Sequence, residues 1–108
     1  QRFPDAENLL ALQGWVYQIK WEEWNSKASL NKALAINPRN VIALLRTGIW
    51  HFMNQEYDEA KLNFEDVTLI DKWGEFGAQA AEYLDKTKRE QMLAGTGTTI
   101  DTNNQIVQ

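Results

Sequence analysis

The fold is decided by residues 7–74, which divide into two consecutive stretches of equal length. Residues 7–40 read ENLLALQGWVYQIKWEEWNSKASLNKALAINPRN, and residues 41–74 read VIALLRTGIWHFMNQEYDEAKLNFEDVTLIDKWG. When the second stretch is aligned beneath the first, similar residues fall at the same positions. The pairs are Leu10 with Leu44, Gly14 with Gly48, Ser26 with Ala60, Leu30 with Phe64, Ala33 with Val67 and Ile36 with Ile70. An internal period of this length, about 34 residues, is typical of stacked helical repeats.

Apolar residues within each stretch recur three or four positions apart, which is helical spacing. Pro38 cannot continue a helix, and Asn40 is a suitable N-cap for the helix that follows. Asp58 and Glu59 fall in a first helical turn, where the helix dipole favours negative charge. The pattern predicts helices over residues 5–18, 24–36, 40–53, 57–70 and 74–91. From Leu93 onward the helical period is lost, which predicts a polar tail.

Gly14 and Gly48 occupy the same position in the two stretches and lie in the middle of predicted helices. Glycine has no Cβ, so it lets a partner helix approach closely. Leu30 and Phe64 are then expected to fill the space between successive helix pairs.

These residues resemble the tetratricopeptide repeat (TPR) family, whose helix–turn–helix carries the pattern W-x2-L-G-x2-Y, then A-x3-F, then P. The matching positions are Leu10, Gln13, Gly14, Tyr17, Ser26, Leu30 and Pro38 in the first repeat, and Leu44, Thr47, Gly48, His51, Ala60, Phe64 and Lys72 in the second. The resemblance covers about residues 2–91. It implies an all-α superhelix, an α-solenoid fragment. In this division residues 1–91 form the domain, with repeats at about 7–40 and 41–74, a capping helix at 74–91 and a polar tail at 92–108. The alternative is an unrelated helical bundle, which has no reason to repeat at a fixed interval.

Two features leave the architecture open in part. The turn Trp21-Glu22-Glu23-Trp24 departs from the family pattern, so the angle of the first helix pair is not fixed by the resemblance. Pro4 stands where the family closes a repeat, as though an earlier repeat ended there. Two repeats fall below the roughly three that a stable solenoid needs. The chain is therefore expected either to belong to a longer array or to self-associate.

The composition of the 108-residue chain disfavours several functions. Its net charge of −4 opposes nucleic-acid binding, and no apolar run predicts membrane insertion. The lack of Cys excludes disulfides and thiolate chemistry. Together with a start at Gln1 rather than Met, it slightly favours an exported bacterial protein over a cytoplasmic one.

No catalytic, metal or cofactor site is expected. His51, the one histidine, falls at a packing position, and its sequence neighbours supply neither a nucleophile nor an orienting acid. The acidic pairs do not alternate as in a calcium loop. The run Ala94–Thr99 lacks the lysine and the flanking strand and helix of a phosphate-binding loop. The chain is therefore predicted not to be an enzyme.

A second, mostly apolar face runs along the first helix of each repeat. The resemblance implies that this face lines a concave groove for a protein or peptide partner. Its positions are Ala11, Trp15, Gln18, Ile19, Leu45, Ile49, Phe52 and Met53, with Phe76 and Tyr83 as an extension. Family members that clamp a C-terminal carboxylate use Lys and Asn where this chain has Ala11, Trp15, Leu45 and Ile49, so an apolar helix or extended peptide is expected instead. The alternatives are a self-assembling structural unit whose face is covered by the chain itself or by a copy, and an accessory domain of a larger enzyme.

Overall fold

The computed structural model of the chain describes residues 6–96, which form five α-helices. The helices are α1 (Ala6–Ile19), α2 (Glu23–Ile36), α3 (Val41–Met53), α4 (Tyr57–Ile70) and α5 (Glu75–Thr96). The all-α fold with consecutively packed helices is confirmed. The predicted boundaries agree with the first four helices, but α5 continues to Thr96 instead of ending at 91. Residues 97–108 of the expected tail, which include the second half of the run Ala94–Thr99, lie outside the described residues, as does Pro4.

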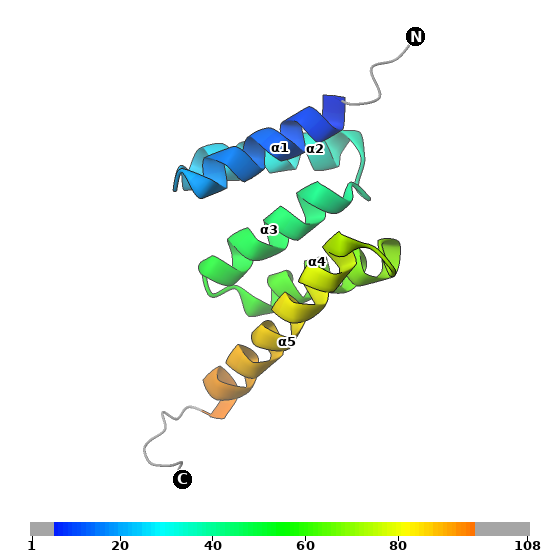
Figure 1. Cartoon of the computed structure of the whole chain (residues 1–108). Coiled ribbons are helices and arrows are strands. Elements are labelled where there is room, and N and C mark those ends of the chain that lie inside the picture. Colours follow the sequence, from blue (N-terminus) through cyan, green and yellow to red (C-terminus); the bar gives the residue numbers. More distant parts are fainter. Residues whose placement is uncertain (1–5, 97–108) are drawn as a thin grey trace.

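The helices form two layers, with α1, α3 and α5 in one and α2 and α4 in the other (Figure 1). Successive helices pack as antiparallel neighbours, α1 against α2 and α3 against α4, and α5 packs against α4. Helix α3 lies at the centre and also contacts α1, α2 and α5. We call the layer made by α1, α3 and α5 the odd-helix face.

The glycines mark the closest approach within each helix pair. A Cβ on Gly14 would lie 2.6 Å from Cγ of Leu30, and one on Gly48 would lie 2.6 Å from Cε1 of Phe64. The Ser26 hydroxyl also donates a hydrogen bond of 2.7 Å to the carbonyl of Gly14. The close approach predicted from the two glycines is therefore confirmed.

Both helix pairs turn in the same way. Trp21 and Gln55, which occupy equivalent positions in the two repeats, each have φ of 63°, the left-handed conformation that commonly ends a helix. The next amide then bonds back to the helix, Glu22 to the Tyr17 carbonyl and Glu56 to the His51 carbonyl, both at 2.8 Å. The unusual Trp21–Trp24 sequence thus keeps the backbone turn of the second repeat.

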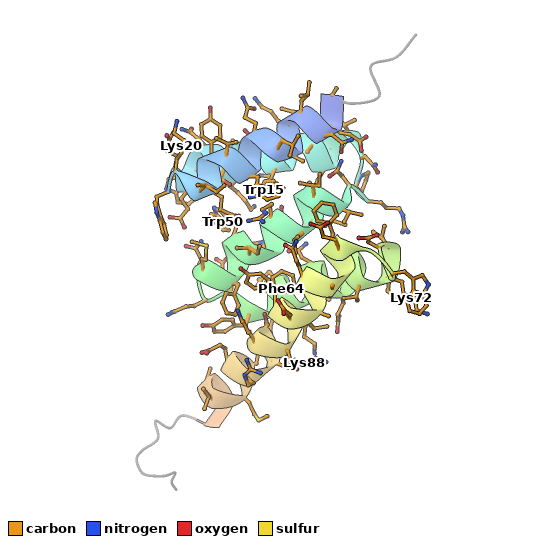
Figure 2. All side chains as sticks on the ribbon, in the orientation of Figure 1. Trp15, Lys20, Trp50, Phe64, Lys72 and Lys88 are labelled. Carbon is orange, nitrogen blue, oxygen red and sulfur yellow. The ribbon has the colours of Figure 1, made fainter. Side chains whose placement is uncertain are left out.

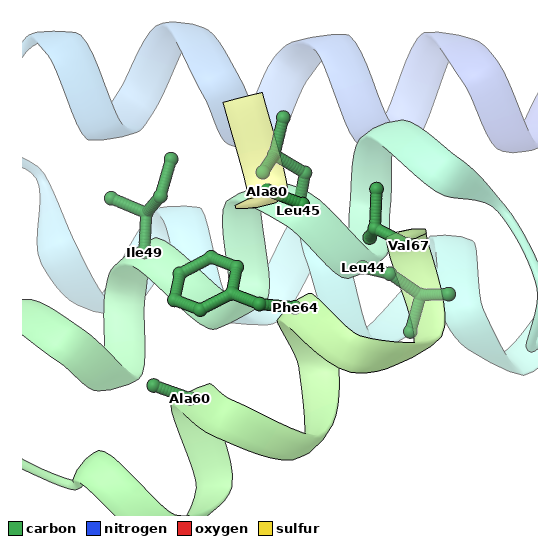
Figure 3. Close-up of a cluster of buried hydrophobic side chains, with 7 residues drawn as sticks. All are labelled: Leu44, Leu45, Ile49, Ala60, Phe64, Val67 and Ala80. Carbon is green, nitrogen blue, oxygen red and sulfur yellow. The ribbon is translucent and has the colours of Figure 1, made fainter. Parts of the chain in front are cut away.

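Two clusters of buried side chains form the core. One joins α3, α4 and α5 through Leu44, Leu45, Ile49, Ala60, Phe64, Val67 and Ala80 (Figure 3). The other joins the first helix pair to α3 through Ala11, Leu30, Ala33 and Ala43. Each large buried side chain contributes roughly 1.5–3 kcal/mol. Because α3 supplies residues to both clusters, it ties the two repeats together.

Polar caps complete the helix ends. The Asn40 side chain accepts the amide of Ala43 at 2.9 Å, as an N-cap of α3. Its amide group donates to Glu7 and Asn8 at the start of α1. At α5, one Asp71 carboxylate oxygen accepts the amides of Phe76 at 3.1 Å and Gly77 at 3.2 Å. A Cβ at Gly77 would overlap the Asp71 carbonyl, so this cap requires glycine there.

Candidate functional site

The residues predicted for the groove all lie on α1 or α3, but they differ in exposure. Ile19 and Met53 are exposed, and Trp15, Gln18 and Phe52 are half-buried. Ala11 is fully buried, and Leu45 and Ile49 keep only 1% and 5% of their surface exposed. The expectation of one apolar surface formed by Trp15, Leu45, Ile49 and Phe52 is corrected on this point, because Leu45 and Ile49 offer a partner almost no area.

Helix α5 explains this burial. Leu45 and Ile49 pack with Phe64 and Ala80 in the larger core cluster. Phe76 and Tyr83, which were expected to extend the groove, pack against the same cluster. Tyr83 stacks on Phe64 with ring centroids 5.3 Å apart and meets Phe52 edge-on at 5.9 Å. The chain's own last helix therefore covers part of the predicted apolar face.

Arg46 occupies the part of the odd-helix face between α1 and α3. Its guanidinium carbon lies 4.1 Å from the ring centroid of Trp15, which points from α1 toward α3 (Figure 2). Its Nη1 donates to Oε1 of Gln18 at 3.1 Å, and Nε2 of Gln18 donates to the Arg46 carbonyl at 3.0 Å. Two side chains of α1 thus hold the guanidinium, which extends from α3, in place.

The charge of Arg46 is unbalanced within the described residues 6–96. No carboxylate there lies within ion-pair distance of it, and its Nε is buried without a hydrogen-bond partner. Burial lowers the pKa of the guanidinium, and the nearby Tyr83 partly opposes this shift. An arginine nevertheless stays protonated in a protein, so the site holds a half-buried cation.

Sequence reasoning missed Arg46, although a signal was present. The residues one repeat length before and after it are Leu12 and Ala80, both apolar. A charged residue at a repeat position that is otherwise apolar is a candidate for a binding role. Arg46 is not apolar, so it does not belong to the apolar stripe that defined the predicted groove.

His51 was expected to be a packing residue, and its surroundings include an acid that was not foreseen. Its Nδ1 lies 2.6 Å from Oε1 of Glu56, across the turn between α3 and α4. Its ring meets Trp50 edge-on at 5.4 Å. The Glu56 amide also donates to the His51 carbonyl, so the two residues are joined twice. This arrangement fixes the turn, and no side-chain hydroxyl bonds to the imidazole in the described part of the chain.

Two kinds of feature, a metal-binding cluster and a membrane-spanning helix, are not found in the described residues. Residues 6–96 hold no group of three or more His, Asp or Glu side chains arranged to bind a metal ion. Within the same range, every helix is too short or too polar to traverse a lipid bilayer.

The chain is similar to one segment of a larger protein. No family model matches the chain. It is 34% identical over 77 residues to a protein of Arabidopsis thaliana named peptidyl-prolyl cis-trans isomerase PASTICCINO1. The match takes in 70% of this chain but only 12% of that protein. The isomerase activity in the name is therefore stated of the whole Arabidopsis protein, and the similarity concerns one short segment of it.

Proposed function

We propose that the chain is a TPR module without enzymatic activity that binds a segment of another protein on its odd-helix face. The internal sequence period, the glycines that admit Leu30 and Phe64, and the two equivalent turns support the TPR assignment. A repeat segment within a larger protein is also consistent with the partial match to the Arabidopsis protein.

Arg46 is the observation that carries the binding proposal. The half-buried guanidinium has no anion beside it in the described chain, and its Gln18 hydrogen bond and Trp15 contact replace its lost hydration only in part, because Nε is left without a partner. A carboxylate from a partner would restore those interactions through charge-assisted hydrogen bonds. The half-buried ring of Trp15 offers apolar contact beside it, and the half-buried ring of Phe52 lies further along α3. The ligand expected from this arrangement is a peptide segment with an acidic side chain next to an apolar one.

Selection from a random peptide library displayed on phage tests this proposal. We expect enriched peptides to share an acidic residue beside an apolar anchor. Their binding should fall at least tenfold in Arg46→Met, which loses a charge-assisted contact of about 1.5–3 kcal/mol. Trp15→Ala should weaken binding as well.

Leu69→Ala serves as the matched control, because Leu69 is exposed on α4, in the other layer. It should leave peptide binding unchanged. Peptides that bind Arg46→Met and Trp15→Ala as tightly as the wild type would show that the odd-helix face is not the working surface.

A second candidate function, a structural unit in a helical assembly, is favoured by an exposed apolar stripe on α1. The stripe consists of Leu9, Leu12, Val16 and Ile19. The second-repeat counterparts of Leu9 and Val16 are Ala43 and Trp50, both buried where α3 meets the first helix pair. The stripe therefore stands where a preceding helix pair would pack. Sedimentation equilibrium tests whether a second copy covers it: Leu12→Glu with Val16→Glu should turn any oligomer into a monomer.

A further inference from the structure

A separate concavity lies where the α1–α2 turn meets the end of α3. It encloses about 260 Å³ and is lined by Gln18, Trp21, Glu23, Trp50, Met53 and Asn54. We call it the turn pocket. It shares Gln18 with the Arg46 site but does not include Trp15 or Arg46, which carry the proposed peptide-binding function.

Two tryptophans, Trp21 and Trp50, are among the residues that line the turn pocket. Trp21 is 79% exposed, and Trp50 is held by a hydrogen bond of 3.0 Å from its indole Nε1 to the Glu23 carbonyl. Indole rings attract cations through their negative faces, and such cation–π contacts are present within this chain. The ammonium of Lys27 lies 5.0 Å from the Trp50 ring centroid, and the guanidinium of Arg46 lies 4.1 Å from that of Trp15.

The electrostatics of the turn pocket also favour a cation. Helices α1 and α3 both end there with partial negative charge, whereas α2 begins there at Glu23 with partial positive charge, so the Glu23 carboxylate is the main reason to expect a cation. The Glu23 carboxylate has no ion pair in the described part of the chain, whereas Glu22 is paired with Lys20 at 3.6 Å. The pocket thus joins an unpaired carboxylate to an exposed indole.

Trp21 gains little for the fold from its position. Its side chain is exposed, and its repeat counterpart is the polar Gln55 in the same backbone conformation. The turn therefore forms equally well without an aromatic residue. The indole is available for a ligand.

We propose that the turn pocket binds the guanidinium of an arginine side chain from a protein partner. A guanidinium is planar, so it can stack on the Trp21 indole while it donates two hydrogen bonds to the Glu23 carboxylate. This proposal is independent of peptide binding on the odd-helix face, because neither Trp21 nor Glu23 takes part in the Arg46 site. One can fail while the other holds.

Titration with a short arginine peptide, acetyl-Gly-Arg-Gly-amide, tests the proposal by NMR of the tryptophan indole Nε1–H signals. We expect the signals of Trp21 and Trp50 to shift at roughly millimolar peptide, since a single exposed cation–π site is weak. The peptide with citrulline, which has the same shape as arginine but no charge, should cause no such shift. Higher salt should weaken binding of the arginine peptide.

Variants locate the site. Trp21→Ala and Glu23→Gln should each weaken binding by roughly fivefold, and both residues are exposed, so the variants are expected to fold. Trp73→Ala and Glu82→Gln are the matched controls, because they remove an exposed tryptophan and an exposed glutamate outside the pocket. Circular dichroism confirms that all four variants are folded.

Equal shifts with the citrulline peptide would overturn the proposal, because they would show that charge is not recognised. Undiminished binding to folded Trp21→Ala or Glu23→Gln would overturn it too. An equally large shift of the Trp73 signal would show unspecific binding to any exposed indole.

Discussion

At the residue scale, the contact between Gly48 and Phe64 controls how closely the second helix pair packs. In Gly48→Ala the new Cβ would lie 2.6 Å from the fully buried Phe64 ring, which cannot move away easily. Alanine gains about 1 kcal/mol of helix propensity. We expect overpacking to outweigh this gain and lower the free energy of unfolding by about 1–2 kcal/mol in urea denaturation. Gly48→Leu should prevent folding.

A double-mutant cycle separates this clash from other effects. In the Phe64→Val background the ring is replaced by a shorter side chain, so Gly48→Ala should be less destabilising by about 1 kcal/mol or more. An additive pair of substitutions would contradict the close-approach explanation.

Trp21 and Gln55 allow a second prediction at this scale. Both residues hold a left-handed conformation that glycine adopts without strain. Trp21→Gly and Gln55→Gly should each raise the free energy of unfolding by about 0.5–1 kcal/mol. Only Trp21→Gly should weaken arginine-peptide binding, by roughly fivefold as in Trp21→Ala. A loss of stability in Trp21→Gly alone would mean that the indole supports the fold.

The residues also show where sequence reasoning succeeds and where it fails. The partners of Gly14 and Gly48 were predictable because the period aligns them with Leu30 and Phe64. The burial of Leu45 and Ile49 was not, since an apolar stripe looks the same whether a partner or the chain itself covers it. The Glu56 partner of His51 was hidden as well, because the separation of the two residues is not a helical spacing. Only the turn between them brings the two side chains together.

At the scale of elements, Asp71 determines how α5 begins. Its carboxylate accepts two amides that would otherwise be unsatisfied in the first turn. Asp71→Ala should lower the free energy of unfolding by about 0.5–2 kcal/mol, and hydrogen exchange at Phe76 and Gly77 should become faster.

The neighbouring variants give this prediction its controls. Asp71→Asn keeps an acceptor oxygen and should retain most of the stability. Asp66→Ala removes an exposed carboxylate from α4 and should change little. Unchanged exchange at Phe76 and Gly77 in Asp71→Ala would show that the cap does not hold the helix end.

The helices themselves were largely predictable, since apolar periodicity and Pro38 fix the first four. The end of α5 was not. Gly95 and Thr96 have low helix propensity, which predicted a tail, yet the helix continues through them. An established helix can extend through a few residues of low helix propensity, so propensity alone is a weak guide to where a helix ends.

At the scale of the whole molecule, stability is expected to be highest in the centre. Each helix packs mainly on its neighbours in the chain, and α3 contacts all four others. Chains of this kind lose structure from their ends inward. Amide hydrogen exchange should therefore be slowest in α3 and faster in α1 and in the last turns of α5. Equal protection throughout would indicate one fully cooperative unit.

The exposed apolar stripe on α1 makes the two ends of the molecule chemically different. At the opposite end, the outward side of α5 presents charged residues such as Glu82, Asp85, Lys86 and Arg89. A helix pair joined before α1 could bury the exposed apolar stripe. A helix pair joined after α5 would meet charged side chains, which are costly to bury. Two copies fused in tandem would thus fold as separate domains that do not pack against each other. A continuous rod would form only after the charged side of α5 was rebuilt with apolar residues.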